Sequence, residues 1–190
     1  GYYRDQTLLF AQGHLNPEKL FAAIYAHPDI EKEPMSAGRQ MVGHFSTTLV
    51  DEKGAWLDQT LTKNHISDVS STAAQMPRLI GLAQASKIYR NSKIKNANRF
   101  SDNGNEIAWG TIGNASTSEG LFFEAINTAG VLQIPMVMSV WDDDYGISVD
   151  NKQQTTKESI SKALAGFGRE DDTGIEILNV KGWDYPALVK

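Results

Sequence analysis

The sequence contains no cysteine among its 190 residues. This absence excludes disulfide frameworks and cysteine-ligated metal sites, and it fits a reducing compartment, so we expect a cytoplasmic protein. The sequence also lacks any block of basic residues, and its 18 Lys and Arg against 23 Asp and Glu give a net charge of −5. That balance gives no support for a nucleic-acid partner or for binding to an anionic membrane.

Long hydrophobic runs are missing as well. The most apolar stretch, residues 122–141, is interrupted by Glu124, Asn127, Gln133 and Pro135, so it does not read as a membrane span. The first residues carry charge inside a short apolar run and do not resemble a signal peptide.

The length and composition suit one soluble domain. Apolar residues make up 41% and charged residues 22% of the chain, enough for a sizeable core. We expect a single domain over residues 1–190, with a helical and loop-rich part at 1–100 and alternating strands and helices at 105–190. Because the sequence starts with Gly1 and its last residues read as part of a helix, we expect a fragment of a longer polypeptide; a processed, complete protein is the alternative.

The first part shows helical signals separated by a polar loop. Asn16 followed by Pro17 predicts a helix start, with Asn as the cap and Pro in the first turn. The apolar residues of this helix recur at helical spacing, at Leu20, Phe21, Ile24 and Tyr25. The other elements expected here are a helix at 3–10, a loop at 30–54, and a helix at 72–89 whose regular part begins near Pro77.

The second part alternates short apolar runs with amphipathic segments. We predict strands at 106–112, 134–141 and 175–180, and helices at 118–132, 155–167 and 185–190. Near-continuous apolar strands alternating with helices indicate an α/β fold, a doubly wound parallel sheet flanked by helices on both faces.

Two polar segments follow successive strands, at 113–120 and 141–146. In open parallel sheets, ligands bind beyond the carboxyl ends of the strands. The first segment offers backbone N–H groups and a helix N-terminus to a phosphate, with Ser116 or Ser118 as the cap, although an ordinary capped loop is the alternative. The second is an acidic turn, for which a solvated turn is the alternative. Together they bring Asn114 and Asp143 to one sheet edge as oxygen ligands for Mg²⁺ beside a phosphate.

Residues 113–148 resemble the thiamine diphosphate motif of 2-oxo acid dehydrogenase alpha subunits. That motif begins Gly-Asp-Gly, continues through Ala-x-Ser-Glu-Gly and a helix with Glu-Ala-x-Asn, and closes with Asn-Asn-x-Tyr. The matching residues are Ser118-Glu119-Gly120, Glu124-Ala125, Asn127, Pro135 and Tyr145-Gly146-Ile147-Ser148. Upstream matches are Tyr3-Arg4, Gly38-Arg39-Gln40-Met41 with His44, and Ser70-Ser71 through Gln75-Met76-Pro77. The resemblance therefore covers nearly the whole chain.

The resemblance implies a Mg²⁺ ion held by Asn114, Asp143 and the backbone carbonyl of Tyr145. This sequence departs from the family at two of these positions, because the family has Asp where Asn114 stands and Asn where Asp143 stands. The two substitutions exchange charge, so the site still presents one carboxylate and one amide oxygen. Trp141 replaces a residue that is usually charged, which puts a diphosphate contact from that side in doubt. Ala115 replaces the second Gly.

Further residues take roles only through the resemblance. Tyr3 and Arg4 are expected to contact the cofactor diphosphate, and a surface helix start is the alternative. Ser71 is expected on the aminopyrimidine side, or else as a helix cap. His44 is expected near the substrate as a catalytic residue, or else in an exposed loop. The remaining expected cofactor contacts are Gly113, Ala115 and Ile147.

The resemblance also implies the reaction and the partners. The cofactors would be thiamine diphosphate and Mg²⁺, and the substrate a branched-chain 2-oxo acid or pyruvate, with acyl transfer to lipoamide. A beta-type half, separate or fused, would supply the glutamate that activates the cofactor, and an acyltransferase component with a lipoyl domain would accept the acyl group. We therefore expect an oligomer, and no turnover by these 190 residues alone.

Two other functions compete with this one. A non-catalytic assembly domain would bind a partner half without cofactor. A Rossmann-like nucleotide binder is disfavoured, because no G-x-G-x-x-G follows a strand and no G-x-x-x-x-G-K-[ST] occurs.

Overall fold

The computed structural model describes residues 2–40, 45–66 and 69–190. The chain forms two compact units, an N-terminal unit of residues 1–70 and 93–103 and a C-terminal unit of residues 71–92 and 104–190. The long helix of residues 76–91 thus belongs with the strands that follow it. A single domain over 1–190 stays a prediction.

In the described part of the N-terminal unit, two helices, α1 (Tyr2–Ala11) and α2 (Pro17–Ile24), are accompanied by two short 3₁₀ turns, η1 (Gln59–Leu61) and η2 (Ala97–Arg99). The predicted start of α2 is confirmed, because the Asn16 side chain accepts the N–H of Lys19 at 2.9 Å. Its large apolar side chains are mostly exposed, and Ala23 is the buried one. The described part of residues 30–54 has no helix and no strand beyond an isolated bridge between Val50 and Trp56, as predicted.

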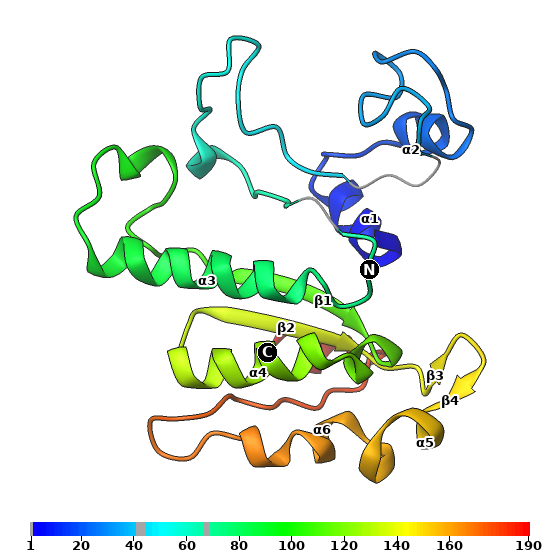
Figure 1. Cartoon of the computed structure of the whole chain (residues 1–190), viewed down its shortest axis with the longest axis vertical. Helices are drawn as coiled ribbons and strands as arrows, with labels where there is room; N and C mark the ends of the chain where they lie inside the picture. Colours follow the sequence, from blue (N-terminus) through cyan, green and yellow to red (C-terminus); the bar gives the residue numbers. More distant parts are fainter. Residues whose placement is uncertain (1, 41–44, 67–68) are drawn as a thin grey trace. The chain divides into compact units, whose positions relative to one another are not determined.

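A parallel strand pair is the centre of the C-terminal unit. Strands β1 (Ala108–Gly113) and β2 (Met136–Trp141) pair in parallel, with Ala108 opposite Met136 and Gly113 opposite Trp141. Helix α4 (Gly120–Leu132) connects them (Figure 1). A small antiparallel hairpin of β3 (Tyr145–Gly146) and β4 (Val149–Asp150) follows β2. The prediction of a mixed α/β fold with parallel strands is therefore confirmed.

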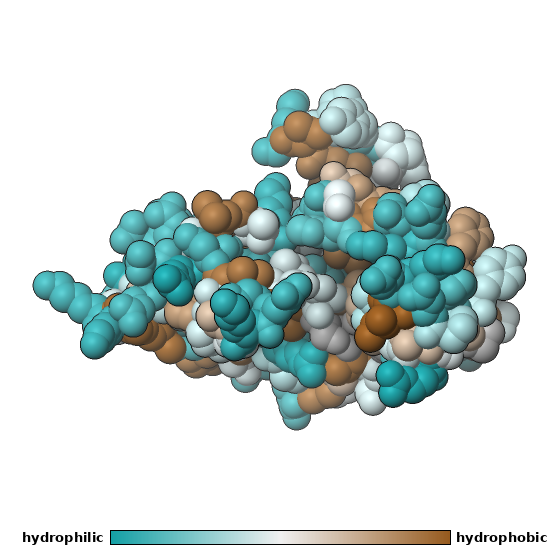
Figure 2. Space-filling model, turned by 90° about the horizontal axis from the view of Figure 1, so that it is seen from above, coloured by the Kyte–Doolittle hydropathy of each residue, from teal (hydrophilic) through white to brown (hydrophobic). Residues whose placement is uncertain are grey.

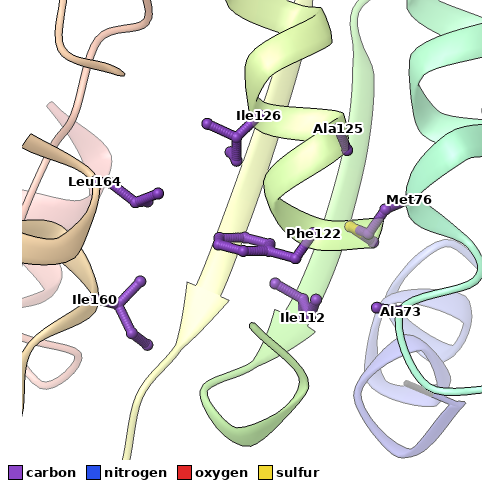
Figure 3. Close-up of a cluster of buried hydrophobic side chains, with 8 residues drawn as sticks. All are labelled: Ala73, Met76, Ile112, Phe122, Ala125, Ile126, Ile160 and Leu164. Carbon is purple, nitrogen blue, oxygen red and sulfur yellow. The ribbon is translucent and has the colours of Figure 1, made fainter. Parts of the chain in front are cut away.

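The core lies on one face of this strand pair. Alternate strand residues share a face, and those packed in the two buried clusters are Ala108, Ile112, Met136, Met138 and Val140. Helix α3 (Met76–Asn91) and helix α4 cover this face, and Figure 3 shows Phe122 of α4 lying over Ile112. Gly110 allows α3 to approach, since a Cβ there would lie 2.6 Å from a Leu79 methyl. On the opposite face Trp109 is 61% exposed, so helices on both faces stay a prediction.

The predicted helix at 155–167 is wrong. Three short segments stand there instead, namely η4 (Thr156–Glu158), α6 (Ile160–Ala163) and η5 (Ala165–Phe167), and the short helix α5 (Asn151–Gln154) precedes them. Lys157 has φ +62°, which interrupts a right-handed helix, and Ser159 then caps α6 by accepting the N–H of Lys162 at 3.4 Å. Ile160 and Leu164 nevertheless pack in the core.

The predicted strand at 175–180 is wrong too. Ile175 forms only an isolated bridge with Gly168, and its N–H donates to the carbonyl of Phe167 at 2.9 Å. Ile175 and Ile177 nevertheless pack against the core. The expected last helix is present as α7 (Tyr185–Val189), and α3 begins at Met76, as Pro77 predicted.

The outer surface is mixed in polarity. Figure 2 shows, on one face, hydrophobic residues in small groups between hydrophilic ones. Among the described residues, no helix combines the length and the apolar character needed to cross a membrane.

The adjacent aromatic residues of α4 provide a test of this core. Phe122 is fully buried, Phe123 is 38% exposed, and the two rings contact each other edge to face. Phe122→Ala should lower the free energy of unfolding by about 3–5 kcal/mol, because it leaves a cavity in the core. Both Phe122→Ala and Phe123→Ala lose the ring contact, so their difference in urea unfolding measures burial. Equal losses for the two variants would contradict the packing described here.

Candidate functional site

The two polar segments predicted to meet do begin side by side. Gly113 and Trp141 are register partners at the ends of β1 and β2. The pairing continues one residue further, because the N–H of Asn114 donates to the carbonyl of Trp141 at 3.2 Å. Asn114 therefore lies directly beside the start of the acidic turn, as the sequence predicted.

Asn114 joins this turn through a buried residue that the sequence reasoning missed. Its Nδ2 donates to Oδ1 of Asn151 at 3.0 Å, and Nδ2 of Asn151 donates to Oδ1 of Asp142 at 2.9 Å. Both asparagines are 3% exposed. We call this chain of side chains, Asn114–Asn151–Asp142, the amide relay. Asn151 belongs to no motif and lies 37 residues from Asn114, so no pattern in the sequence points to it.

The oxygen atoms at this edge suit a hard cation. Asn114 donates through its nitrogen, which leaves its side-chain oxygen as the acceptor. Asp143 is exposed, and its Oδ1 accepts the N–H of Tyr145 at 3.3 Å. Amide, carboxylate and backbone carbonyl oxygens are ligands that Mg²⁺ prefers. Within the described ranges, no cluster of three or more His, Cys, Asp or Glu side chains forms a metal site, so a cation here would rely on this mixed oxygen set.

The segment after β1 leaves a helix start without a side-chain cap. Residues Ala115–Ser118 form the 3₁₀ turn η3, and α4 follows from Gly120. The predicted cap by Ser116 or Ser118 is wrong: the N-cap of α4 is Glu119, whose side chain makes no capping bond, and Ser118 Oγ instead donates to the carbonyl of Gln154 at 3.4 Å. An N-terminus without such a cap suits a phosphate group.

The β3–β4 hairpin packs tightly against η3. A Cβ at Gly146 would lie 2.5 Å from the Cβ of Ala115, so only glycine fits there. The next residue, Ile147, is fully exposed and has φ +59°. A β-branched residue in this conformation is strained by about 1–3 kcal/mol, and strain of this kind gathers at functional sites.

The other predicted site residues are not brought into this cluster by the described geometry. Tyr3 and Arg4 lie in α1 of the N-terminal unit, and their side chains are outside the described part, as is the whole of His44. Ser71 is exposed near the start of the C-terminal unit, where its carbonyl accepts the N–H of Ala74 at 3.1 Å. Gln75 is the N-cap of α3, so the alternative role of Ser71 as a helix cap is wrong.

A buried carboxylate in the N-terminal unit organises the segment that resembles the family's Gly-Arg-Gln-Met stretch. Glu33 accepts the N–H groups of Met35, Ser36 and Gly38 at 2.8, 2.9 and 3.0 Å, and the Ser36 hydroxyl at 2.6 Å. Ser36 Oγ in turn accepts the N–H of Gln40 at 3.0 Å. One side chain, only 1% exposed, thus holds the turn that leads to Gly38 and Gln40. Sequence reasoning missed it, because a lone Glu in a polar loop reads as solvated.

The chain belongs to the dehydrogenase E1 component family, whose profile matches residues 1–190. It is 28% identical over 168 residues to the 2-oxoisovalerate dehydrogenase subunit alpha of Bacillus subtilis (strain 168), covering 88% of this chain and 42% of that protein. It is also 28% identical over 108 residues to the pyruvate dehydrogenase E1 component subunit alpha of Acholeplasma laidlawii, covering 57% and 26% of the two chains. The family resemblance found in the sequence is confirmed, and the chain spans less than half the length of either relative.

The hydrogen bonds to Glu33 predict a pH-dependent contribution to stability. Burial raises the pKa of its carboxyl, but the bonds from the Ser36 hydroxyl and from the N–H groups of Gly38, Met35 and Ser36 outweigh it and hold the pKa below its ordinary value of 4.5. A lowered pKa in the folded state stabilises the protein above pH 4.5, and the contribution is lost as pH falls through the folded value.

Glu33→Gln should therefore reduce the free energy of unfolding at pH 7 by about 1–3 kcal/mol, and the deficit should shrink below the ordinary pKa. Urea unfolding at pH 7 and at steps down to pH 3 measures both effects. Glu31→Gln, two residues away and exposed, removes the same charge and is the control. A deficit that is equal for the two variants, or constant with pH, would argue against the Glu33 cluster.

Proposed function

We propose that this chain is the thiamine diphosphate- and Mg²⁺-binding half of a 2-oxo acid dehydrogenase. The observation that supports this most strongly is Asn114, a buried amide held beside the end of β2 with its nitrogen already engaged. It belongs to the segment that matches the family's cofactor motif, and the family profile spans the whole chain.

The proposed cation ligands are the side-chain oxygens of Asn114 and Asp143 and the backbone carbonyl of Tyr145. The proposed diphosphate contacts in the C-terminal unit are Gly113, Ala115 and the uncapped start of α4. Ile147 is proposed to touch the cofactor, which would account for a strained backbone at an exposed residue.

The remaining roles rest on the family resemblance. Arg4 and Tyr3 are proposed to contact the diphosphate, since a guanidinium pairs well with phosphate oxygens. Ser71 is proposed to face the aminopyrimidine, and His44 to lie near the substrate. When bound, the cofactor supplies an electron sink for the loss of CO₂, while the residues named above anchor and orient it.

The partners and the substrate are part of the same proposal. A beta-type half, separate or fused, supplies the activating glutamate, and an acyltransferase component with a lipoyl domain receives the acyl group. We propose a branched-chain 2-oxo acid as substrate, because the Ser-Ser and Gly-Arg-Gln-Met matches lean to that type and a similar protein is named for 2-oxoisovalerate. Pyruvate is the alternative, named for another relative.

The exchanged ligands also support a second candidate. The family's Asp and Asn stand here as Asn114 and Asp143, and a site that had lost its metal would tolerate such changes. The chain would then be an assembly domain that binds its partner half without cofactor.

Calorimetric titration of thiamine diphosphate, with and without Mg²⁺, distinguishes the two candidates. The sample is the longest natural form of the protein together with its beta-type half. We expect Mg²⁺-dependent binding that Asp143→Ala weakens by about tenfold or more, because a carboxylate ligand of the cation is lost. Asp172→Ala removes an exposed aspartate elsewhere in the C-terminal unit and should leave binding unchanged. Absence of binding with the partner half present would favour the assembly domain.

Substrate preference gives a further prediction. In the assembled enzyme, kcat/KM for CO₂ release should be about tenfold or more higher with 2-oxoisovalerate than with pyruvate, since a pocket shaped for the branched side chain gains from burying its extra methyl groups. The measurement is CO₂ release at matched concentrations of the two acids. A preference for pyruvate would assign the enzyme to the pyruvate type instead.

A further inference from the structure

We infer that Asp142 and Asn151 are positioning residues that determine which atom of the Asn114 side chain faces the cation. The inference rests on the proposed Mg²⁺ site and concerns two residues that contact neither metal nor cofactor in that proposal. It derives from the amide relay, in which Asn114 and Asp142 are joined through Asn151.

The carboxylate of Asp142 determines which atom donates and which accepts in each hydrogen bond of the relay. An ionised carboxylate only accepts hydrogen bonds, so the Asn151 atom that faces it at 2.9 Å must be the NH₂ group. The oxygen of Asn151 then faces Asn114, and the Asn114 atom that meets it at 3.0 Å must also be NH₂. The oxygen of Asn114 is therefore the atom left for a cation.

The backbone holds both ends of this relay. The N–H of Asn151 donates to the carbonyl of Asp144 at 2.9 Å, and its own carbonyl accepts the N–H of Thr155 at 2.8 Å. Asp142 Oδ1 also accepts the N–H of Asp144 at 3.1 Å. Asn114 is fixed from the other strand by its N–H bond to Trp141. All three residues of the relay are thus held by hydrogen bonds besides those of the relay itself.

The direction matters because position 114 carries an amide. A carboxylate, as the family has there, presents an oxygen in either of its two flipped orientations. An amide presents oxygen in one and NH₂ in the other, and the NH₂ group repels a cation. An asparagine ligand therefore needs a partner that selects one orientation, and the relay supplies that partner.

Three variants separate the effect of the Asn114 orientation on Mg²⁺ binding from the effect of losing a carboxylate charge. Asn151→Leu removes the relay without changing the net charge. Asp142→Ala removes the group that sets the direction, whereas an asparagine there could still accept the N–H groups of Asp144 and Asn151 through its oxygen. The double variant Asp142→Ala/Asn151→Asp restores the same direction at Asn114, because the new aspartate only accepts hydrogen bonds and so faces the NH₂ group of Asn114. Asp172→Asn is an exposed control for loss of one carboxylate.

The first readout is the Kd of Mg²⁺ at saturating thiamine diphosphate, measured by calorimetry on the protein assembled with its beta-type half. We expect Asn151→Leu and Asp142→Ala each to weaken Mg²⁺ binding by about tenfold, as disruption of residues that orient a metal ligand does. The double variant should return to within about threefold of the unaltered protein. The second readout is the unfolding midpoint without metal or cofactor, which shows whether each variant is folded.

The outcomes test the positioning role of Asp142 and Asn151 separately from the proposed function. Mg²⁺ binding by Asn151→Leu that equals the unaltered protein overturns the inference and leaves the cofactor site in place. A double variant no better than Asp142→Ala overturns it as well, and this comparison still decides if Asn151→Leu does not fold. Failure of the unaltered protein to bind thiamine diphosphate with Mg²⁺ overturns the proposed function, and the inference with it.

Discussion

The parallel pairing of β1 with β2 is the constraint on which the candidate site depends. The last register pair is Gly113 and Trp141, and one more hydrogen bond follows it, from the N–H of Asn114 to the carbonyl of Trp141. Two loops separated by a whole helix in the sequence therefore leave the strand ends together. The pair is held by the helices packed on one of its faces, where Ile112, Phe122 and Met76 are almost completely buried. A slip of one residue between the strands would turn Ile112, the strand residue among these, away from the core and separate Asn114 from the acidic turn.

Three consecutive aspartates have three different environments at this edge. Asp142 turns to the buried Asn151, Asp143 accepts the N–H of Tyr145 while its side chain is exposed, and Asp144 takes a left-handed backbone and offers its carbonyl to Asn151. The turn is therefore not simply solvated, although composition alone favours that interpretation. The burial of Asn151 gives the exposed Asp142 its importance, because a buried amide left without a partner costs free energy that a surface amide does not.

The sequence predicted what depends on local patterns. The strands at 106–112 and 134–141 were placed within two residues, because both are apolar runs between turn residues, and the Asn16 cap and the Pro77 helix start follow from local chemistry. The helix at 155–167 and the strand at 175–180 failed, because the backbone there follows a left-handed Lys157 and a bond from Ile175 to Phe167. Of the candidate site, the meeting of Asn114 with the acidic turn was predictable. Asn151 and Glu33 were not, because each gains its role from partners that no spacing encodes.

Exchanging a carboxylate and an amide between the two proposed ligand positions changes the geometry of the site. Carboxylate and amide side chains have nearly the same shape, so the replacement of Asp and Asn by Asn114 and Asp143 conserves volume and total charge. It does not conserve symmetry, since only the carboxylate offers oxygen in both orientations. At the exposed position the carboxylate can follow a cation without further support, whereas the buried amide has to be oriented beforehand. The amide stands at position 114, and the relay contacts the side chain at this same position. Asn151, a buried residue outside the cofactor motif, thus supports the orientation of a residue inside it.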